Sequence, residues 1–397
     1  MRVLIIGAGI GGLALAACLE RRGVSDVVLV EQAVKQRGTG AGIQITSNAV
    51  HVLEWLSLKD ELEKIGHISR GNIYRDIDDG HLVLHAEGGD QVSEMYGNSN
   101  YQLNREDLAN MLRRRLSKKI QLYSETCVGV RMDGKKAVAT LSNGEEIRGD
   151  VLIGADGVGS VTRNYISDDG AAQFAGVACW RSLIPGAEAA QIPLDRHSHA
   201  WFGKGRSVVA YWVGHGAYLN FVGSVEADEE LRSSWRAKGT AQDLRNSFQG
   251  VTPIVRDLIE MVRSPFITGI YKHRPLDRYY KDSIAVMGDA AHPMMPYMAA
   301  GAGQAIEDSF ALAWCLDSAD GNIAVALSEY DERRRCRANR VQRASEEMAN
   351  IYHHGNSVST IGDTAFRNLV RGTGAGHFRD WLWSYNIVRD MRDRSVD

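Results

Sequence analysis

Residues 3–31 read VLIIGAGIGGLALAACLERRGVSDVVLVE, and this stretch decides the fold of the first part of the chain. Val3–Ile6 and Val27–Val30 are short apolar runs of the kind that form buried parallel strands. Leu13–Leu19 lies between them and is rich in Ala and Leu, as expected of a helix. The three runs predict a strand–helix–strand unit with the glycines in its first turn.

The glycines of this turn have the G-x-G-x-x-G spacing at Gly7, Gly9 and Gly12, with Gly11 as a fourth glycine. This spacing permits a tight turn, close approach of the backbone to a pyrophosphate, and close packing of the helix on the strand. The free N–H groups and the positive end of the helix dipole would then hold the phosphates. Glu31 ends the second strand nineteen residues after Gly12, where a carboxylate can accept hydrogen bonds from an adenosine ribose. The pattern predicts an adenine dinucleotide site and leaves NAD and FAD as alternatives.

The bulk composition narrows the class of protein. Of 397 residues, 44% are hydrophobic and 24% are charged, which is typical of a soluble globular chain large enough for two packed units. A formal net charge of −3 gives no global attraction for nucleic acid, and no apolar segment approaches the ~18 residues of a membrane span. The five cysteines lie far apart, which indicates neither a disulfide framework nor a zinc site. We therefore expect a cytoplasmic protein with no metal, nucleic-acid or membrane partner.

Farther along the chain, α/β segments alternate with β-rich segments. Alternating apolar and polar residues predict antiparallel strands over about 71–102 and again over 176–270, with one helical insertion near 229–248. The α/β pattern then resumes, and helices are predicted over about 303–316 and most of 324–352. This order predicts an α/β fold in which a Rossmann-type domain is interleaved with a β-rich domain, with C-terminal helices after both.

Two later motifs resemble those of a known family when they are taken with GAGIGG and Glu31. GADG stands at Gly154–Gly157, and GDAAHPMMPYMAAGAG stands at Gly288–Gly303. In this order the motifs resemble the single-component FAD-dependent aromatic hydroxylases, a family of flavoprotein monooxygenases, over nearly the whole chain. HPMMPYMAAGAGQAIED is similar to the salicylate, 3-hydroxybenzoate and 6-hydroxynicotinate hydroxylase group. The resemblance implies that the nucleotide is FAD and that NAD(P)H is a co-substrate.

The resemblance also implies a discontinuous domain organisation. The expected ranges are 1–70, 101–175 and 271–340 for the FAD-binding domain, 71–100 and 176–270 for the β-sheet substrate domain, and 341–397 for a C-terminal helical segment.

Several cofactor residues are implied by the family motifs. Arg105 matches the family's R-x-x-D/E-L helix, for which Asn104 is a plausible N-cap. Asp289 matches the GD motif, whose carboxylate contacts the ribityl chain, and Asp156 with Gly157 matches the DG motif. The helix start at 301–303 could stabilise negative charge on reduced flavin. The residues expected to bind the cofactor are Gly7, Gly9, Gly11, Gly12, Glu31, Gly42, Arg105, Asp156, Gly157, Asp289, Gly301, Ala302 and Gly303.

The expected substrate residues are positions where the chain departs from its relatives. Gln44, Ser207 and Tyr297 stand where some of those enzymes place histidines, whereas Tyr211 keeps the tyrosine of the R-x-x-x-x-Y strand. Period-two alternation puts Ser207, Val209 and Tyr211 on one face of that strand. With an ordinary pKa near ~10, Tyr211 and Tyr297 are better donors or orienters of a substrate hydroxyl than bases. We expect them to face the substrate from opposite domains.

Two further residues have alternative interpretations. Arg181, in ACWRSLIP, is predicted to clamp a substrate carboxylate, to shape access for flavin and nicotinamide, or to form a surface ion pair. His292 is the titratable neighbour of the flavin motif and a candidate catalytic group, with a structural hydrogen bond as the alternative.

The resemblance implies a reaction in which NAD(P)H reduces FAD, O2 adds to form a flavin hydroperoxide, and the distal oxygen attacks an electron-rich ring. The expected substrate is a small aromatic or heteroaromatic compound with an activating group, such as a hydroxy-aromatic acid. The alternatives are an FAD oxidase or dehydrogenase, a flavin monooxygenase acting on another class of substrate, and a nucleotide-binding module without chemistry. A monomer or a homodimer is expected.

Overall fold

The computed structural model describes residues 1–32, 41–227, 239–354 and 378–393. Its first layer is a six-stranded sheet in the order β18-β19-β12-β1-β2-β8, parallel except for β18 at one edge. The strands are β1 (Arg2–Ile6), β2 (Asp26–Val30), β8 (Gln121–Tyr123), β12 (Val151–Gly154), β18 (Tyr280–Lys281) and β19 (Ile284–Val286).

The two faces of this sheet are covered differently, because alternate residues of β1 point to opposite sides. Val3 and Ile5 pack against α1 (Ile10–Arg21) and α11 (Gly301–Ser318). Leu4 and Ile6 pack against a three-stranded antiparallel sheet made of β9 (Cys127–Asp133), β10 (Lys136–Leu141) and β11 (Glu146–Gly149). The parallel sheet is therefore buried on both sides, as its continuous apolar strands require.

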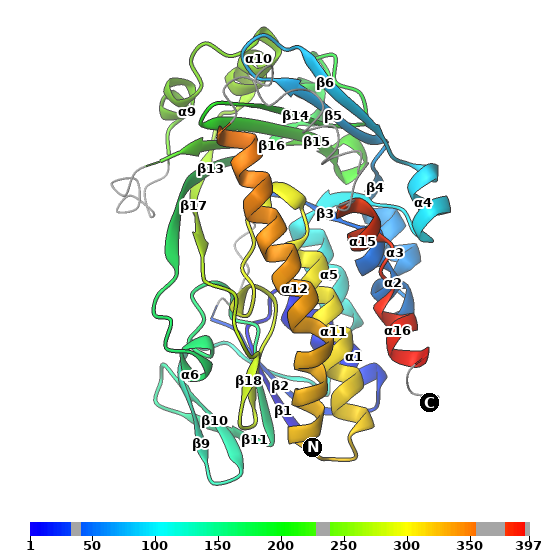
Figure 1. Cartoon of the computed structure of the whole chain (residues 1–397), viewed down its shortest axis with the longest axis vertical. Helices are drawn as coiled ribbons and strands as arrows, with labels where there is room; N and C mark the ends of the chain where they lie inside the picture. Colours follow the sequence, from blue (N-terminus) through cyan, green and yellow to red (C-terminus); the bar gives the residue numbers. More distant parts are fainter. Residues whose placement is uncertain (33–40, 228–238, 355–377, 394–397) are drawn as a thin grey trace.

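A seven-stranded sheet forms the other end of the molecule (Figure 1), in the order β17-β13-β16-β15-β14-β5-β6. All its pairs are antiparallel except β14 with β5. Its strands are β5 (Gly71–Asp76), β6 (Leu82–Glu87), β13 (Gln173–Pro185), β14 (Ser198–Gly203), β15 (Arg206–Val213), β16 (Tyr218–Glu226) and β17 (Phe266–Lys272). An apolar cluster joins one face to short helices, which are α7 (Gly186–Ala189), α9 (Ala241–Ser247) and α10 (Pro253–Met261). The opposite face is turned toward the parallel sheet.

Smaller elements connect the two sheets. The strands β3 (Gly42–Ile45), β7 (Tyr101–Asn104) and β4 (His67–Ile68) form a third antiparallel sheet in the order β3-β7-β4. The accompanying helices are α2 (Ser47–Trp55), α3 (Lys59–Ile65), α4 (Asp90–Tyr96), α5 (Arg105–Arg115) and α6 (Arg163–Ile166), with single turns η1 (Gly214–Gly216), η2 (Gly288–Ala290) and η3 (Pro296–Met298).

The C-terminal part of the described chain is helical. The 32-residue helix α12 (Ile323–His354) runs beside α11 and reaches the seven-stranded sheet (Figure 1). The helices α15 (Phe378–Trp383) and α16 (Ile387–Asp393) lie against α2. Within the described ranges, no helix is both long enough and apolar enough to cross a membrane.

The predicted fold class is confirmed: a Rossmann-type unit is interleaved with a β-rich unit and followed by helices. The expectation of strands throughout 71–102 was only partly right, because Asp90–Tyr96 is the helix α4. Gly89 and Gly97 stand at its two ends with φ of 64° and 83°, and Val92 is buried on its inner side. Of the helical insertion predicted near 229–248, residues 229–238 lie outside the described chain.

Candidate functional site

The glycine turn after β1 is pressed against a second loop on one side and open on the other. Gly7 has φ of 100°, and a Cβ atom there would lie 2.4 Å from the carbonyl oxygen of Ala155. A Cβ on Gly12 would lie 1.9 Å from the carbonyl oxygen of Gly7, so helix and turn touch through the missing side chain. A Cβ on Gly9 would meet nothing within 4 Å. Gly9 lines the cavity between the seven-stranded sheet and the segment 294–302, which we call the main cavity. The turn can therefore receive a phosphate only on its Gly9 side.

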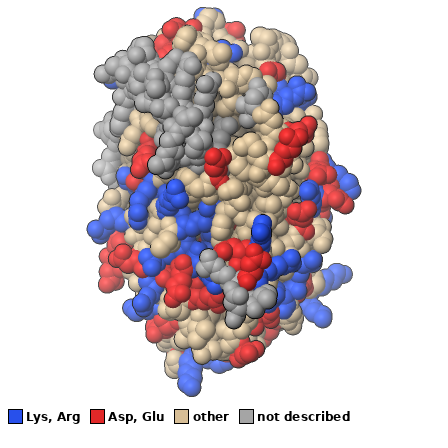
Figure 2. Space-filling model, turned by 45° about the vertical axis from the view of Figure 1, so that its right-hand side comes forward, with Lys and Arg blue, Asp and Glu red and all other residues tan. Residues whose placement is uncertain are grey.

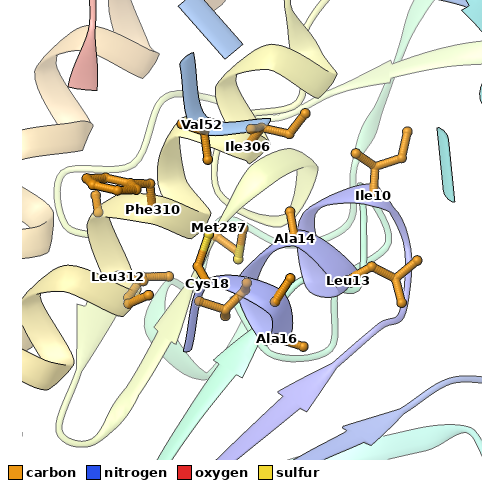
Figure 3. Close-up of a cluster of buried hydrophobic side chains, with 14 of the residues drawn as sticks. Ile10, Leu13, Ala14, Ala16, Cys18, Val52, Met287, Ile306, Phe310 and Leu312 are labelled. Atoms are coloured by element: carbon orange, nitrogen blue, oxygen red, sulfur yellow. The ribbon is translucent and has the colours of Figure 1, made fainter. Parts of the chain in front are cut away.

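The helix after the turn is fixed by close packing. Ile10, Leu13 and Cys18 of α1 belong to one buried cluster with Ile306 and Phe310 of α11 (Figure 3). At Gly11 an added Cβ would come within 3.2 Å of both Ala305 Cβ and Met287 Cε, so this glycine sets the close approach of the two helices. Gly11 also lines the cavity. The predicted glycines thus have two different roles: some allow the helix and the turn to pack closely, and others leave the backbone open to a phosphate in the cavity.

Glu31 lies at the end of β2, beside the same turn. Its Oε2 accepts a hydrogen bond of 2.8 Å from the backbone N–H of Ala8. The carboxylate is therefore held at the carboxyl edge of the parallel sheet, where dinucleotides bind in this type of fold.

Arg105 is the first residue of α5, which Asn104 caps as predicted by accepting a 2.9 Å bond from the N–H of Glu106. Arg105 is exposed and lines the cavity. Its guanidinium has no hydrogen-bond or ion-pair partner among the residues that the structure describes. No carboxylate of the described residues lies within ion-pair distance of this cation.

The loop after β12 contributes backbone rather than a carboxylate. Asp156 accepts bonds from Ser160 Oγ at 2.6 Å and from both the N–H and the Oγ1 of Thr162 at 3.2 Å. Burial raises the pKa of Asp156, and these hydrogen bonds oppose the rise. The carboxylate is thus turned into its own loop, whereas Ala155 and Gly157, with φ of 76°, line the cavity.

Arg163, which sequence reasoning missed, ties this loop to the GD motif. It is fully buried, and Nη1 donates to the carbonyl oxygens of Ala290 at 3.1 Å and Ala291 at 2.9 Å. Its Nη2 pairs with Asp169 at 2.6 Å. The only available signal was its place six residues after GADG; nothing in the sequence identifies the carbonyl groups that it binds.

Asp289 lies deep in the molecule with its side chain exposed to the cavity. Burial raises the pKa of this carboxyl group, while His292 and Arg105 lower it. An added Cβ on Gly301, at the start of α11, would lie 3.7 Å from Asp289 Oδ1. Gly301 and Ala302 line the cavity, so the positive end of the α11 dipole faces it. Gly303 instead packs against α2, with an added Cβ 3.5 Å from Asn48 Nδ2.

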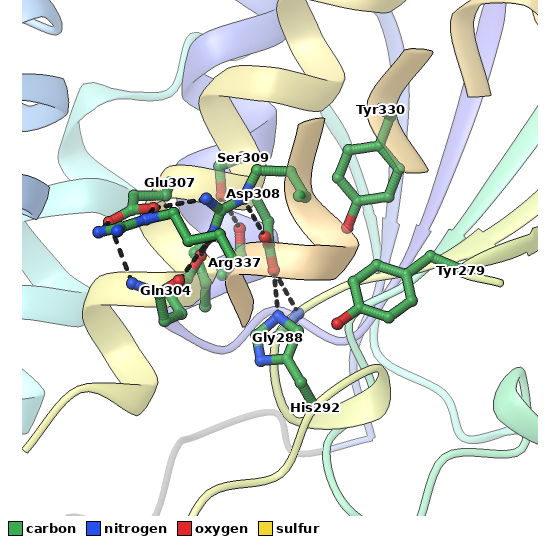
Figure 4. Close-up of polar contacts among 12 residues, drawn as sticks. Tyr279, Gly288, His292, Gln304, Glu307, Asp308, Ser309, Tyr330 and Arg337 are labelled. Atoms are coloured by element: carbon green, nitrogen blue, oxygen red, sulfur yellow. Dashed lines mark hydrogen bonds and ion pairs between the residues drawn. The ribbon is translucent and has the colours of Figure 1, made fainter. Parts of the chain in front are cut away.

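The structure does not bring His292 to the cavity. Its side chain is fully buried, and its Nε2 lies 2.6 Å from Asp308 Oδ2 on α11 (Figure 4). The same oxygen accepts a 2.9 Å bond from the N–H of Gly288, and Asp308 Oδ1 accepts a 2.7 Å bond from Arg334 Nε. The His292 side chain is therefore linked to the GD turn through Asp308 and not through the cavity. This geometry favours the structural interpretation of His292 over a direct catalytic one.

The charges around Asp308 form a buried network. Burial would raise the pKa of Asp308, but His292 and Arg334 lower it, to about 2. Glu307 pairs with Arg334 at 2.5 Å and with Arg337 at 2.8 Å. Arg337 continues the network by donating to the carbonyl oxygens of Trp381 and Leu382, each at 2.9 Å. The network connects the GD turn, α11 and α12 with the C-terminal helix α15.

The main cavity has a volume of about 390 Å³ and lies between the seven-stranded sheet and the segment 294–302. The register of the sheet sorts its lining into rows. One row runs Arg181, Val222, Val209, Ala200 and Tyr74 across five strands. The floor therefore has a cation at one end, an aromatic ring at the other, and an apolar middle. The adjacent rows supply Ser207, Ser224, Tyr211, Ser198 and Asn72.

The predicted substrate residues all line this cavity. Tyr211 is buried on the same strand face as Ser207, and burial raises its pKa whereas Arg181 lowers it. Gln44 Nε2 donates to Ser198 Oγ at 3.3 Å from the β3 side. Tyr297 comes from η3 on the opposite wall, and its hydroxyl lies 2.6 Å from His353 Nε2.

Other positions close the site. An added Cβ on Gly42 would lie 2.6 Å from Asn220 Cγ and 2.9 Å from Tyr211 Cε2, so this glycine lets β3 lie over the sheet. Tyr352 of α12 and Trp383 of α15 form part of the wall. Their positions were not foreseen, because no sequence signal in the C-terminal helices indicates contact with the cavity.

Comparison with known proteins identifies the class of this site. An FAD binding domain model matches residues 1–345, so the chain belongs to this FAD-binding family. It is similar to the 3-amino-4-hydroxybenzoate 2-monooxygenase of Streptomyces cremeus, with 33% identity over 89% of this chain and 88% of that protein. It is also similar to the 3-hydroxybenzoate 6-hydroxylase of Polaromonas naphthalenivorans, with 28% identity over 97% and 96% of the two chains. A salicylate hydroxylase substrate complex has the same fold, with a TM-score of 0.82 and 24% identity over 99% of this chain and 97% of that chain.

The protein is accordingly an FAD-dependent aromatic monooxygenase that uses NAD(P)H and O2, as the resemblance implied. The residues fit the cofactor: an open glycine turn, an unpartnered Arg105 and the cavity-facing Asp289 border one space.

Proposed function

We propose that the enzyme hydroxylates a small aromatic acid that carries a ring hydroxyl or amino group. The observation that carries this proposal is Arg181, a half-buried residue at the end of the apolar row of the cavity floor. Among the residues that the structure describes, no carboxylate pairs with it. A partly desolvated guanidinium is costly without a counter-charge, and a planar carboxylate can accept two of its hydrogen bonds. We therefore infer that the missing anion is part of the substrate.

The rest of the floor suits the ring of such an acid. Val222 and Val209 stand next to Arg181 in the same row, so a flat apolar ring can lie on them while its carboxylate meets the guanidinium. Tyr211 and Ser207 lie in the two flanking rows and can hydrogen-bond a ring substituent. We assign to Tyr211 the role of orienting that substituent, and to Gln44 that of supporting the polar row through Ser198.

We propose a matching arrangement for the cofactor. Glu31 would hold the adenosine ribose, Gly9, Gly11 and Arg105 the pyrophosphate, and Asp289 the ribityl chain. The flavin ring would lie beside Gly42, Gly157, Gly301 and Ala302. When bound and reduced by NAD(P)H, FAD supplies the activation of O2 and transfer of one oxygen atom. The chain's own residues bind and orient the ring and exclude water from it.

Three properties of the whole molecule complete the proposal. We place the enzyme in the cytoplasm, because all five cysteines are free thiols and four of them are buried. We propose that it works without nucleic acid, because Lys and Arg lie interspersed with Asp and Glu over the face drawn in Figure 2. We propose a monomer or a homodimer.

A ligand screen tests the substrate class. The purified yellow holoenzyme is mixed with salicylate, 3-hydroxybenzoate, 3-amino-4-hydroxybenzoate and the neutral counterpart of each acid without its carboxylate. We expect at least one acid to perturb the flavin spectrum and accelerate NAD(P)H oxidation, with a hydroxylated product, and its neutral counterpart to do so more weakly. Preference for the neutral compounds would contradict the role of Arg181. Oxidation of an amine or alcohol without oxygen incorporation would favour an oxidase or dehydrogenase.

A further inference from the structure

Three histidines gather on the face of the seven-stranded sheet that is turned away from the main cavity. His199 of β14 pairs with Ile73 of β5, and Ile73 pairs with His85 of β6, so two of the histidines belong to one row across three strands at the top of Figure 1. Tyr74, the next residue of β5, lines the main cavity, and successive side chains of a strand point to opposite faces. The row of His85 and His199 therefore faces away from the proposed substrate and cofactor.

The third histidine, His197, stands just before β14 and lies between the other two. Its ring meets the His85 ring with the centroids 4.9 Å apart and the His199 ring with the centroids 6.5 Å apart. The Nε2 atom of His197 lies 3.1 Å from the Nε2 atom of His85. Two ring nitrogens this close form a hydrogen bond in which one carries the proton and the other accepts it. Both Nε2 atoms therefore point toward one position between the two rings.

Asp195 fixes which nitrogen of His197 faces His85. Its Oδ1 lies 2.8 Å from His197 Nδ1 and accepts a 3.0 Å bond from the backbone N–H of the same residue. The same oxygen lies 3.0 Å from His199 Nε2, and the His199 ring stacks on Trp201. A carboxylate beside Nδ1 keeps a proton on that nitrogen and leaves the lone pair on Nε2, as it does for histidines that bind metals in proteins.

The spacing of the two Nε2 atoms suits a single metal ion. At metal–nitrogen distances of about 2.0–2.1 Å, two nitrogen ligands lie about 2.9 Å apart at a right angle and about 3.3 Å apart at the tetrahedral angle. The 3.1 Å between His85 and His197 falls between these values. Imidazole is a ligand that suits zinc, copper and nickel. Within the described ranges, no group of three or more histidine, cysteine, aspartate or glutamate side chains could hold a metal ion, so water would fill the remaining positions around an ion held by this pair.

We propose that His85 and His197 bind a divalent transition-metal ion such as Zn2+, and that Asp195 orients His197 for this role. The inference is independent of the proposed function. The ion would tie β6, the last strand of the sheet, to the segment before β14 across the intervening β5. It would thereby hold in place an edge strand that pairs on one side only. The expectation of no metal rested on the spacing of the cysteines; His85 and His197 are 112 residues apart, and no spacing rule connects them.

The test uses Zn2+ alone and untagged holoenzyme from which metal ions have been removed. Zn2+ binding is titrated in competition with a chromophoric chelator for wild type, His85→Ala, His197→Ala and Asp195→Asn. His81→Ala and Cys336→Ser are the controls, because both residues are exposed and neither belongs to the histidine cluster. Cu2+ in place of Zn2+ gives an electron paramagnetic resonance spectrum from which nitrogen ligands are counted. Retention of bound FAD verifies that each variant is folded.

Wild type and both controls should bind one equivalent of Zn2+, and His85→Ala and His197→Ala should lose this binding. Asp195→Asn should bind Zn2+ about 10–100-fold more weakly, because His197 Nδ1 loses its charged partner. Cu2+ bound to wild type should show two nitrogen ligands from the protein.

Thermal unfolding gives a second measurement. Zn2+ should raise the unfolding temperature of wild type but not that of His85→Ala, because only the folded sheet brings the two histidines together. Absence of stoichiometric Zn2+ binding by wild type would overturn the proposal, and so would equal Zn2+ affinity of wild type and His85→Ala. Loss of the binding in Cys336→Ser would also overturn it, since the ligand would then be the exposed thiol.

Discussion

Arg181→Gln is the change that most directly tests the substrate assignment. Gln keeps much of the length and some hydrogen-bonding capacity of the side chain, but it removes the charge and the two-pronged donor geometry. Because no described residue pairs with Arg181, the loss falls on the ligand alone and is not shared with a protein partner. A hydrogen bond to a charged group contributes about 1.5–3 kcal/mol, which corresponds to about 10–150-fold weaker binding of the acid.

The stability of the free protein should move in the opposite direction. An unpaired cation facing an apolar floor is destabilising, so Arg181→Gln should unfold at the same temperature as wild type or at a higher one. A large fall in unfolding temperature would mean that the guanidinium holds the fold together instead of waiting for a ligand. Unfolding is followed by circular dichroism, with bound flavin measured in the same samples.

The assay is a cycle of two proteins and two ligands. The affinities of wild type and Arg181→Gln are measured by flavin perturbation, for the best acid from the screen and for its analogue without the carboxylate. The penalty of the substitution should appear with the acid and vanish with the analogue. Arg263→Gln is the matched control, because Arg263 is 78% exposed and outside the cavity lining. An equal penalty with both ligands would refute a contact between Arg181 and a carboxylate.

Four further outcomes are expected. Glu31→Ala should lose FAD more readily on dilution, because the adenosine ribose loses a charged acceptor. Wild-type FAD affinity in this variant would contradict the assignment of Glu31 to the ribose. Asp289→Ala should impair FAD retention or the rate of flavin reduction, and full flavin content with normal turnover would show that its carboxylate is not needed. Tyr211→Phe should weaken substrate binding by about 0.5–1.5 kcal/mol or raise the yield of hydrogen peroxide released in place of product. Wild-type substrate affinity together with a wild-type peroxide yield would show that the Tyr211 hydroxyl does not contact the substrate. Asp308→Asn should lower the free energy of unfolding by on the order of 3–5 kcal/mol, since it leaves buried cations without their counter-charge. Because the folded-state pKa of Asp308 is lowered to about 2, the stabilisation by its carboxylate is present above pH ~4 and is lost as the pH falls toward 2. Acid unfolding curves of the variant should no longer show this loss.

The parts of the site that follow from local pattern could be predicted from the sequence. The glycine turn and Glu31 are fixed by a strand–helix–strand unit whose residues are neighbours in the chain. Period-two alternation places Ser207, Val209 and Tyr211 on one face without any knowledge of the partner strand, and all three line the cavity.

The partners of these residues could not be predicted, because they come from distant segments. His292 looks like a free base in the sequence, but its environment is decided by Asp308, sixteen residues later on another element. Tyr297 meets His353, which is 56 residues away, and this contact decides where its hydroxyl points. Trp383 reaches the cavity wall because distant residues hold α15 in place, among them Arg337, which donates to the carbonyl oxygens of Trp381 and Leu382. Hydrophobic and turn patterns carry no information on such pairings.

The pairing of the parallel sheet also sets the order in which the molecule can be completed during synthesis. Leu4 of β1 pairs with Leu152 of β12, and Leu152 pairs with Ile284 of β19. One edge of β1 and one edge of β12 therefore stay unpaired until a strand far later in the chain has been synthesised. At a ribosome speed of about 5–20 residues per second, β1 waits roughly 7–30 s for β12, and β12 waits nearly as long for β19. Through that interval the nascent chain carries unpaired strand edges that other chains could join. The glycine turn leaves the ribosome before both of its supports: the loop at Ala155 follows after more than a third of the 397 residues, and α11 only after about three quarters of them.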